Sequence, residues 1–441
     1  MIYKDCDIRG VYGEELTLKE VRLIGRAIGT MLNGKSIIVC GDVRVSTGDI
    51  KTELTEGLLE TGADIIDIGI VPTPSAYFAK SRECLAAYAL AIVTASHNPA
   101  QYNGIKLMLG DLPPTPQKIK EIAELVSSGQ FRFSQGRIRK TDILDAYIRK
   151  MKSLAGENAK SLKVVLDIGN GTTAGIAGKI YKECGYEVIE IYGEADGRFP
   201  NRNPNPADFK NITEVCHRVI QENADFGVAF DGDGDRAVFI DDKGRPVINE
   251  KALIFLTASK TEENGKAFSV VYDQKCSRIV PDAIKKMGGE PIRERSGHAF
   301  IKKCFLDNGS ILGGEISGHF FFRELGHDDG IYAGLCLGTY ISKQGRPLSE
   351  IVDSIPDPHI SPDLRYQVAY ENMSCVLERI KEDYAGYPVS TYDGVRVEMP
   401  DAWFLIRKSV TAQEMTLRIE ADSATKMDEL RRKIEERYFA Q

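Results

Sequence analysis

The sequence predicts an α/β protein with three similar α/β domains, whose sheets are mixed, and a smaller α+β domain at the C-terminus. Runs rich in β-forming residues alternate with helical segments, and this alternation recurs three times along the chain. The chain has 441 residues, more than one hydrophobic core usually holds, so several domains are expected. We place the domains at residues 1–140, 141–245, 246–357 and 358–441.

Each repeat begins with a β-rich run that contains or ends near an aspartate, followed by a helical segment that stops at a glycine. The first runs are 36–42, 163–168 and 268–273, and the helical segments stop at Gly62, Gly185 and Gly288. Glycine suits the left-handed conformation in which many helices end. Second strands are predicted at 64–69, 187–192 and 290–295, and third strands at 87–93, 225–230 and 310–312.

A polar loop follows the third strand of every repeat, at residues 94–99, 231–236 and 314–319. In α/β units, ligands bind beyond the carboxyl ends of the strands. Three homologous units would therefore each contribute one polar loop to a shared site. This arrangement is the main argument from the sequence for an active site.

The second loop, Asp231-Gly232-Asp233-Gly234-Asp235-Arg236, has the pattern of a metal site. Its carboxylates fall on alternate residues after the apolar strand 226–230, and its glycines let the chain curl there. All three carboxylates can then face one hard cation, and Arg236 adds a positive charge suited to phosphate. An EF-hand is excluded, because its glycine and glutamate positions hold Arg236 and Asp242. A solvated acidic turn is the plainer alternative.

The first loop offers Ser96 in a turn that Pro99 closes. A serine hydroxyl beside a metal ion can accept a phosphoryl group, because the cation stabilises developing negative charge. The alternative is a serine that only caps a turn, as many serines near Asn-Pro do. His97 and Asn98 would shape the loop or contact phosphate.

The third loop offers Glu315 and Ser317, which lie two residues apart, so that both can face one side of an extended segment. A carboxylate and a hydroxyl can together accept and donate hydrogen bonds with vicinal sugar hydroxyls. His319 and His298 are candidate general acids or bases, although a lone histidine is more often structural.

The composition indicates a globular protein of the cytoplasm. The formal net charge of −7 gives no general attraction to nucleic acid or to anionic membranes. The longest uncharged apolar stretch, 85–96, is far shorter than the roughly 18 residues of a membrane-spanning helix. The N-terminus lacks an apolar signal segment, and nine cysteines without a Cys-x-x-Cys pair favour a reducing compartment.

The last part of the chain differs from the repeats. A proline-rich linker at 356–358 precedes a helix at 371–384, strands at 394–398, 403–407 and 415–420, and a helix from Ser423. We expect this smaller α+β domain to move relative to the rest.

Several motifs occur in an order that is more specific than any one of them. They are Asp7-Ile8-Arg9-Gly10, residues 94–99, Asn103-Gly104-Ile105-Lys106, residues 231–236, Lys275-Cys276-Ser277-Arg278, Gly297-His298 and residues 314–319. Over nearly its full length, the chain resembles the α-D-phosphohexomutases, and most closely their phosphomannomutase/phosphoglucomutase branch.

The resemblance implies a heart-shaped protein of four domains around a central cleft. It also implies reversible phosphoryl transfer between the 1- and 6-positions of mannose or glucose phosphates, which are its small-molecule partners. The catalytic residues would be Ser96, as the phosphate carrier, with Lys106, His319 and Arg236. Ser96, Asp231, Asp233 and Asp235 would hold Mg²⁺, and a hexose 1,6-bisphosphate would be the activator. The substrate-binding residues would be Arg9, Lys275, His298, Glu315, Ser317, Arg407, Ser409 and Thr411.

Segment 407–413 departs from the family pattern, in which Arg-x-Ser-Asn-Thr is followed by a proline two residues later. Arg407, Ser409 and Thr411 are kept, whereas Val410 and Gln413 replace the asparagine and the proline. We hypothesise that phosphate still binds here, through side chains and backbone, in a loop of altered shape.

Three alternatives stay open at this point. A phosphoglucosamine mutase is the second choice. It ranks below the first because that branch favours glutamine at the position where this chain has Ile316. A metal-dependent serine phosphatase would use the same nucleophile and ion but release phosphate to water. A non-catalytic sugar-phosphate binder would fit the altered segment 407–413, but it would not need Ser96. The sequence leaves the oligomeric state open.

Overall fold

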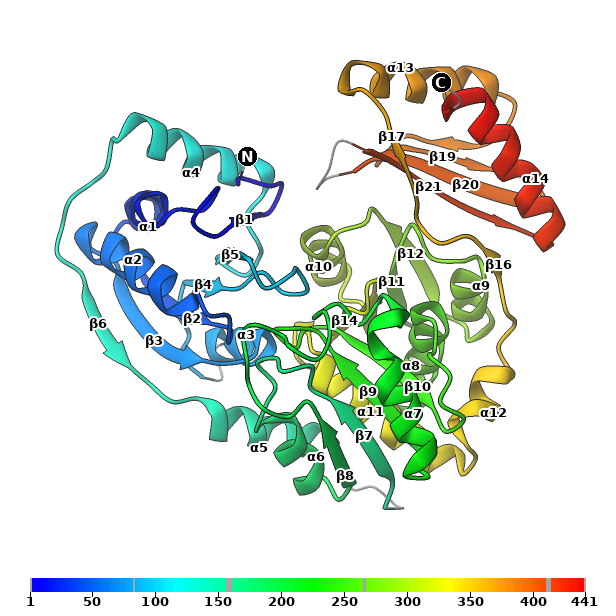
Figure 1. The fold of residues 1–441 in the computed structure, drawn as a ribbon, viewed down its shortest axis with the longest axis horizontal. Coiled ribbons are helices and arrows are strands. Elements are labelled where there is room, and N and C mark those ends of the chain that lie inside the picture. The colour runs from blue at the N-terminus through cyan, green and yellow to red at the C-terminus, as the bar shows by residue number, and fades with distance from the viewer. Residues whose placement is uncertain (1, 82–83, 156–160, 265–266, 410–413, 440–441) are drawn as a thin grey trace.

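A computed structural model describes residues 2–81, 84–155, 161–264, 267–409 and 414–439 of the chain. Three α/β units follow one another along the chain, and a sheet-rich unit ends it (Figure 1). We call them units I to IV, defined by the sheets β1–β6, β7–β10, β11–β15 and β16–β21. The predicted fold class is thereby confirmed.

Unit I has a mixed six-stranded sheet in the order β1-β5-β4-β2-β3-β6, in which β5 runs antiparallel to both neighbours. Its strands are β1 (Asp7–Val11), β2 (Ser36–Gly41), β3 (Asp64–Ile70), β4 (Ala89–Val93), β5 (Tyr102–Leu109) and β6 (Arg137–Lys140). Its helices are α1 (Leu18–Leu32), α2 (Thr47–Glu60), α3 (Thr73–Lys80) and α4 (Pro116–Ser128).

Units II and III repeat the centre of this sheet, with orders β10-β9-β7-β8 and β12-β11-β13-β14-β15. Unit II comprises α5 (Leu144–Ala155), β7 (Lys163–Asp167), α6 (Ala177–Glu183), β8 (Glu187–Ile191), η1 (Phe209–Ile212), α7 (Thr213–Gln221), β9 (Phe226–Phe230) and β10 (Ala237–Asp241). Unit III comprises α8 (Asn249–Asn264), β11 (Ser269–Asp273), α9 (Ile279–Lys286), β12 (Glu290–Glu294), α10 (His298–Asp307), β13 (Leu312–Gly314), β14 (Phe320–Phe322), β15 (His327–Asp328), α11 (Gly330–Gln344) and α12 (Leu348–Asp353).

The threefold repeat is present, with three more strands than the sequence predicted in unit I, one more in unit II and two more in unit III. The parallel triplets β4-β2-β3, β9-β7-β8 and β13-β11-β12 correspond, and Gly62, Gly185 and Gly288 have the expected positive φ. Each third strand then turns back into an antiparallel partner, namely β5, β10 or β14. In unit III the third strand begins at Leu312 instead of Ser310, because Ser310 closes the preceding helix with a hydrogen bond to Phe305 O.

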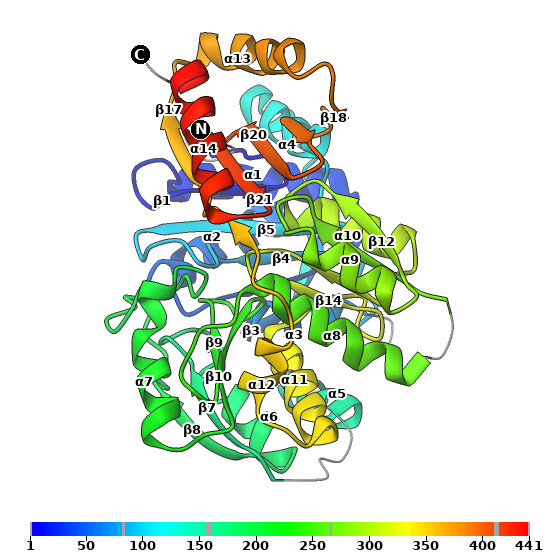
Figure 2. The same cartoon turned by 90° about the vertical axis from the view of Figure 1, so that its right-hand side faces the viewer.

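Unit IV is an antiparallel sheet with helices on one face (Figures 1 and 2). Its elements are β16 (His359–Ile360), β17 (Leu364–Gln367), α13 (Tyr370–Asp383), β18 (Val389–Ser390), β19 (Val395–Glu398), β20 (Ala402–Lys408), β21 (Glu414–Ala421), α14 (Ala424–Ile434) and the π-helix η2 (Glu435–Phe439). Ser423 caps α14 by accepting a hydrogen bond from Lys426 N.

The hydrophobic core divides the molecule into two parts. One continuous cluster runs through units I, II and III, and contains for example Ile92, Phe230 and Leu312. Unit IV has a separate cluster around Phe404 and Leu417. Among the described residues, no helix is long and apolar enough to cross a membrane.

Polar contacts link units III and IV. Glu420 accepts hydrogen bonds from Ser277 Oγ at 2.7 Å and from Arg278 N at 3.0 Å. Arg278 in turn donates to the carbonyls of Met399 and Ala402, both at 2.7 Å. Polar boundaries between domains resemble those of transient complexes and permit relative motion.

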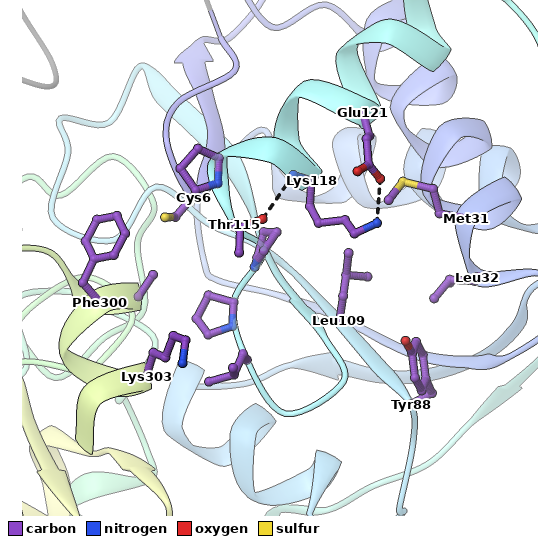
Figure 3. A pocket seen from close by; sticks show the side chains of 15 residues that line it. Cys6, Met31, Leu32, Tyr88, Leu109, Thr115, Lys118, Glu121, Phe300 and Lys303 are labelled. Carbon is purple, nitrogen blue, oxygen red and sulfur yellow. Dashed lines mark hydrogen bonds and ion pairs between the residues drawn. The ribbon is translucent and has the colours of Figure 1, made fainter. Parts of the chain in front are cut away.

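A cavity of about 500 Å³ lies between unit I and helix α10 of unit III (Figure 3). Its lining is mostly apolar and includes Leu109, Leu112 and Phe300. Among the described residues, its lining includes none of the predicted site residues.

Candidate active site

The three polar loops predicted from the sequence meet in space. They occupy equivalent places, because each connects a third strand to its antiparallel partner: β4 to β5, β9 to β10 and β13 to β14. Ser96 Oγ of the first loop donates to Asp231 Oδ2 of the second at 2.7 Å. Arg236 Nε of the second loop donates to His319 Nε2 of the third at 2.9 Å.

Ser96 is held in an unusual backbone conformation. Its φ is +51°, in the left-handed region that residues other than glycine seldom adopt, and its side chain is buried. Its N–H donates to Thr94 Oγ1 at 2.9 Å, and its Oγ lies 3.2 Å from His97 Nδ1. Burial, together with the nearby cations Arg236 and Arg9, lowers the pKa of His97 well below its usual value. The neutral imidazole can therefore donate a hydrogen bond to the serine hydroxyl or accept one from it, depending on its tautomer.

The three aspartates are fully buried, and glycines allow their loop to form. A Cβ on Gly232 would lie 2.6 Å from the carbonyl oxygen of Ser96, so a larger residue would push the two loops apart. Gly234 has φ +80°, which other residues adopt only with strain. Burial and the charges of Asp233 and Asp235 raise the pKa of Asp231 well above its usual value.

Lys106 supplies the nearest positive charge. Its Nζ lies 2.8 Å from Asp233 Oδ2 and 2.6 Å from Asp235 Oδ2. Burial alone would lower the pKa of Lys106, but attraction to these carboxylates outweighs burial and raises it well above its usual value. Asp233 Oδ2 also accepts hydrogen bonds from Thr73 at 2.7 Å and from Thr94 at 3.2 Å.

The carboxylate group fits a divalent cation. Oδ1 of Asp233 and Oδ1 of Asp235 are buried, and no hydrogen-bond donor among the described residues reaches either atom. Oxygen atoms of Asp231, Asp233 and Asp235 lie within 4.8 Å of one another. Because buried carboxylate oxygens need a partner and hard cations prefer oxygen ligands, these three residues could hold a divalent cation.

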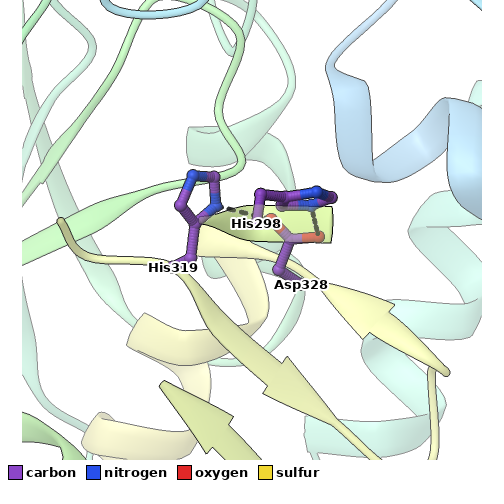
Figure 4. Close-up of side chains that lie close together, drawn as sticks. All are labelled: His298, His319 and Asp328. Atoms are coloured by element: carbon purple, nitrogen blue, oxygen red, sulfur yellow. Dashed lines mark hydrogen bonds and ion pairs between the residues drawn. The ribbon is translucent and has the colours of Figure 1, made fainter. Parts of the chain in front are cut away.

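Two histidines share one buried carboxylate (Figure 4). His319 Nδ1 lies 2.6 Å from Asp328 Oδ2, and His298 Nε2 lies 2.9 Å from Asp328 Oδ1. Burial lowers the pKa of His319, but the carboxylates of Asp235 and Asp328 outweigh it, and the net pKa is raised. Asp328 thus orients both imidazoles and leaves His319 Nε2 turned toward Arg236.

The predicted sugar-binding pair lies next to this group. Ser317 Oγ donates to Glu315 Oε2 at 3.3 Å, and Glu315 Oε1 accepts from Gly297 N at 2.9 Å. His319 Nε2 is 3.9 Å from Glu315 Oε2. Ser296, which precedes Gly297 in the chain, donates to Asp273 Oδ1 at 2.6 Å. Burial and the charge of Glu315 raise the pKa of Asp273 to about 6.

The remaining predicted residues lie at the edges of this centre. Arg9 donates to Asn98 Oδ1 at 2.8 Å and is paired with Asp7. Lys275 pairs with Asp363 of unit IV. Arg407 lies 3.1 Å from Asp393 of its own unit, and Ser409 N donates to Glu414 O at 2.8 Å. Thr411 lies outside the described residues.

Sequence reasoning missed three contributors to the site: Asp328, Thr73 and Arg44. Asp328 and Thr73 carry no local pattern, because each is placed by a contact far along the chain. Arg44 does carry a signal, since it stands two residues after the aspartate that ends the first strand.

Comparisons with known proteins agree with this geometry. Family models described as phosphoglucomutase/phosphomannomutase, alpha/beta/alpha domains I, II and III, match residues 1–133, 145–244 and 249–359. The chain belongs to this family. A phosphomannomutase/phosphoglucomutase of Pseudomonas aeruginosa is 33% identical over 437 residues, covering 98% of this chain and 94% of that protein.

Two further relatives cover the same length. A phosphoglucomutase of Neisseria gonorrhoeae is 35% identical over 440 residues, covering 97% of this chain and 95% of that protein. The crystal structure of a phosphoglucomutase/phosphomannomutase family protein from Burkholderia thailandensis superposes with a TM-score of 0.91 at 31% identity, covering 99% of this chain and 97% of that one. The resemblance predicted from the motifs is confirmed, and so is the assignment to the hexose-phosphate mutases, which are isomerases.

We predict that Asp233→Asn weakens divalent-cation binding by about 100-fold or more, because it replaces a buried charged ligand by a neutral one of the same shape. The affinity would be measured by the loss of the free Mn²⁺ signal in electron paramagnetic resonance. Asp242→Asn, in the β10 turn outside the carboxylate group, is the matched control. Equal Mn²⁺ affinity in the two variants would contradict the assignment.

A second prediction concerns Asp329, which follows Asp328 and caps α11 by accepting from Tyr332 N at 2.9 Å. Its Oδ2 accepts from Tyr147 Oη at 2.7 Å, and burial raises its pKa to about 7. The folded state therefore holds this proton more tightly than the unfolded state, whose aspartate titrates near pH ~3.9. The stability from this group is complete below about pH 4 and is lost as the pH rises to about 7, at up to ~1.4 kcal/mol per pH unit.

Asp329→Asn mimics the protonated side chain. The free energy of unfolding of the variant minus that of the wild type should therefore increase from pH 5 to pH 7. Urea denaturation at the two pH values measures this, with the exposed Asp282→Asn as the control. A constant difference between wild type and Asp329→Asn would rule out the buried proton.

Proposed function

We propose that the protein interconverts hexose 1-phosphates and hexose 6-phosphates, with mannose and glucose phosphates as substrates, through phosphorylated Ser96 and a hexose 1,6-bisphosphate. The observation that carries this proposal is the 2.7 Å hydrogen bond from Ser96 Oγ to Asp231 Oδ2. It places a nucleophile directly against the carboxylate group, which is the arrangement a phosphoryl acceptor needs. A bound hexose 1,6-bisphosphate would load Ser96 and so activate the enzyme.

Two transfers make up the proposed reaction. In the first, the P–Oγ bond of phosphoserine breaks and Oγ takes a proton, while a bond forms to the 6-hydroxyl oxygen of a hexose 1-phosphate and that hydroxyl gives its proton to a base. In the second, the phosphoryl group at position 1 of the bisphosphate moves to Ser96 Oγ, which gives its proton to a base, and the departing oxygen takes a proton. Positioning and charge neutralisation supply most of the rate of such transfers.

The chain's own residues supply the proton transfers. Lys106 is an ammonium paired with Asp233 and Asp235, and we assign to it the proton donation to a departing oxygen. His319 is oriented by Asp328 through Nδ1, so its Nε2 becomes available when a phosphate draws the Arg236 guanidinium away. Ser96, Asp231, Asp233 and Asp235 would hold Mg²⁺, which would neutralise charge on the transferring phosphoryl oxygens.

Substrate would be gripped from units III and IV. Glu315 and Ser317 lie together beside His319, where they would bind the 3- and 4-hydroxyls of the sugar. Glucose and mannose differ at C2, so a grip on these hydroxyls accepts both. The phosphate remote from Ser96 would be bound by Lys275, His298, Arg407, Ser409 and Thr411, with Arg9 near the serine loop.

The test is a coupled assay with Mg²⁺ and a trace of glucose 1,6-bisphosphate, which compares glucose 1-phosphate, mannose 1-phosphate and glucosamine 1-phosphate. We expect turnover of the first two, and a loss of about 1000-fold or more in kcat for Ser96→Ala, because the nucleophile is removed. The exposed Ser128→Ala should behave as the wild type. Turnover of the glucosamine sugar alone would instead identify a phosphoglucosamine mutase, and steady phosphate release would identify a phosphatase.

The altered segment 407–413 gives a separate prediction. Arg407→Ala should raise the KM for glucose 1-phosphate by about 10-fold or more with a smaller change in kcat, because the lost charge contacts phosphate before and during transfer alike. Arg432→Ala, an exposed arginine of the same unit, is the control. An unchanged KM in Arg407→Ala would show that phosphate is bound elsewhere.

A further inference from the structure

We infer that Arg44 and Arg202 are positioning residues for phosphoryl transfer, of which Arg44 fixes the serine loop and Arg202 fixes the metal loop. This inference rests on the proposed function, and it adds a separate task for each arginine. The two occupy related places in units I and II, and neither side chain contacts the group of three aspartates through a hydrogen bond in the described structure.

Arg44 is buried, and each of its five N–H groups has an acceptor. Nε donates to Asp42 Oδ2 at 3.1 Å. The other four bonds reach backbone carbonyls of the serine loop and its exit: Ser96 at 2.8 Å, Asn98 at 2.6 Å, Pro99 at 2.7 Å and Tyr102 at 2.9 Å. A single guanidinium therefore binds the carbonyl of Ser96 and three carbonyls that follow it in the chain.

This convergence explains how Ser96 keeps its left-handed backbone. Such a conformation persists only where the surroundings over-determine it. The carbonyls that Arg44 binds point inward, away from water, and they need a donor there. A lysine can place one charge at this position, but its three N–H groups cannot meet four carbonyls and a carboxylate.

Arg202 makes comparable contacts in unit II, where they support the metal loop. Its Nε donates to Asp167 Oδ2 at 2.8 Å, and its Nη2 donates to Phe230 O at 2.7 Å. Phe230 is the last residue of β9 and immediately precedes Asp231. A third bond, from Nη1 to Asn203 O at 3.1 Å, closes the loop that carries the arginine.

The two arginines bind aspartates that the internal repeat makes equivalent. Asp42, Asp167 and Asp273 stand at or just beyond the end of the first strand of their units. Each accepts a hydrogen bond at Oδ1 from the N–H two residues later, at 2.9, 2.9 and 3.0 Å. In units I and II an arginine pairs with this aspartate. The same arginine binds backbone carbonyls of the serine loop in unit I, and the carbonyl just before the metal loop in unit II.

Unit III lacks the arginine. Among the described residues, Asp273 accepts its side-chain hydrogen bond from Ser296, and no guanidinium is within ion-pair distance of it. The loop that carries Glu315 and Ser317 is thus not tied to its strand in this way. An arginine ties each of the first two loops to its unit, whereas the loop proposed to bind the sugar is held differently, for example by Asn249, which donates to Ile316 O at 2.8 Å.

The fixed loops also support each other. Val43 N donates to Thr172 Oγ1 at 3.3 Å, and that hydroxyl donates to Gly232 O at 2.9 Å. The Phe199 ring, in the loop that carries Arg202, lies 5.0 Å from the Arg44 guanidinium carbon. A Cβ on Gly197 would lie 2.3 Å from the carbonyl oxygen of Val43, so this loop packs directly on the Arg44 segment.

The different tasks of the two arginines give different signatures when each is changed to lysine. Arg44→Lys should lower kcat at saturating Mg²⁺ by about 100-fold, with a change of less than about threefold in KM, since the serine is misplaced but the substrate grip is intact. Hydrogen exchange should be faster in the peptide that contains residues 94–104. Mn²⁺ affinity should change by less than about threefold.

Arg202→Lys should show the complementary pattern. Its Mn²⁺ affinity should fall by about 10-fold or more, because the support behind Asp231 is weakened. Most of the lost activity should return at high Mg²⁺, and exchange in 94–104 should stay close to that of the wild type. Arg396→Lys is the matched control, because Arg396 is a buried arginine bound to Glu398 and to a carbonyl but touches neither loop. It should leave both the exchange of 94–104 and the Mn²⁺ affinity unchanged.

The outcomes separate the inference from the proposed function. If the wild type turns over no hexose phosphate, the proposed function fails, but hydrogen exchange and Mn²⁺ binding still test the arginines. Equal effects of both variants on exchange, on Mn²⁺ affinity and on melting temperature would show a merely structural role and overturn the inference. So would wild-type kcat in Arg44→Lys with unchanged exchange in 94–104.

Discussion

Three buried carboxylates in one loop are the constraint on which the rest of the structure depends. Like charges this close repel strongly where water is excluded, and burial alone disfavours each of them. The carboxylates are stabilised by three donors, Lys106, Thr73 and Thr94. All three belong to unit I, although the aspartates belong to unit II. The charge group can therefore exist only if the two units are rigidly joined, and the core shared by units I, II and III provides that joint. Unit IV, whose core is separate, holds none of these donors.

The internal repeat explains how one site receives parts from three units. Each unit ends its third strand in a hairpin whose loop projects beyond the strand ends, so three equivalent loops can face one point. Divergence of the loops then gives each loop different groups: a serine hydroxyl in the first, three carboxylates in the second, and a carboxylate with a hydroxyl in the third. Polar contacts between units III and IV, such as those of Glu420, leave the fourth unit attached by bonds that water can replace. That attachment suits a unit proposed to bind a phosphate that arrives and leaves.

How far the sequence predicts this arrangement depends on the range of the interactions involved. Strand β9 and the aspartate loop follow from a local pattern, an apolar run and then alternate carboxylates, and both lie where they were predicted. The antiparallel strand Phe320–Phe322 was missed because nothing local marks so short a strand directly after a polar loop. Asp328 was missed for a related reason, since it gains its role only when β15 pairs with β14 and brings it to His319. The predicted roles of Ser96 and the substrate-binding residues stay predictions, although the contacts place most of these side chains around one centre.

Burial of the serine bears on the choice between a mutase and a phosphatase. Both reactions begin with phosphoserine, and they differ in whether water or a sugar hydroxyl attacks it. Ser96 is only 1% exposed, and its hydroxyl contacts Asp231 and His97, so bulk solvent does not reach it in this structure. A hexose phosphate, in contrast, carries negative charge that can draw Arg236 away from His319 and Lys275 away from Asp363. Its binding can thereby make room for the sugar. In the proposed reaction, attack by the sugar would then be favoured, because only the substrate supplies the binding energy that gives access to the phosphorus.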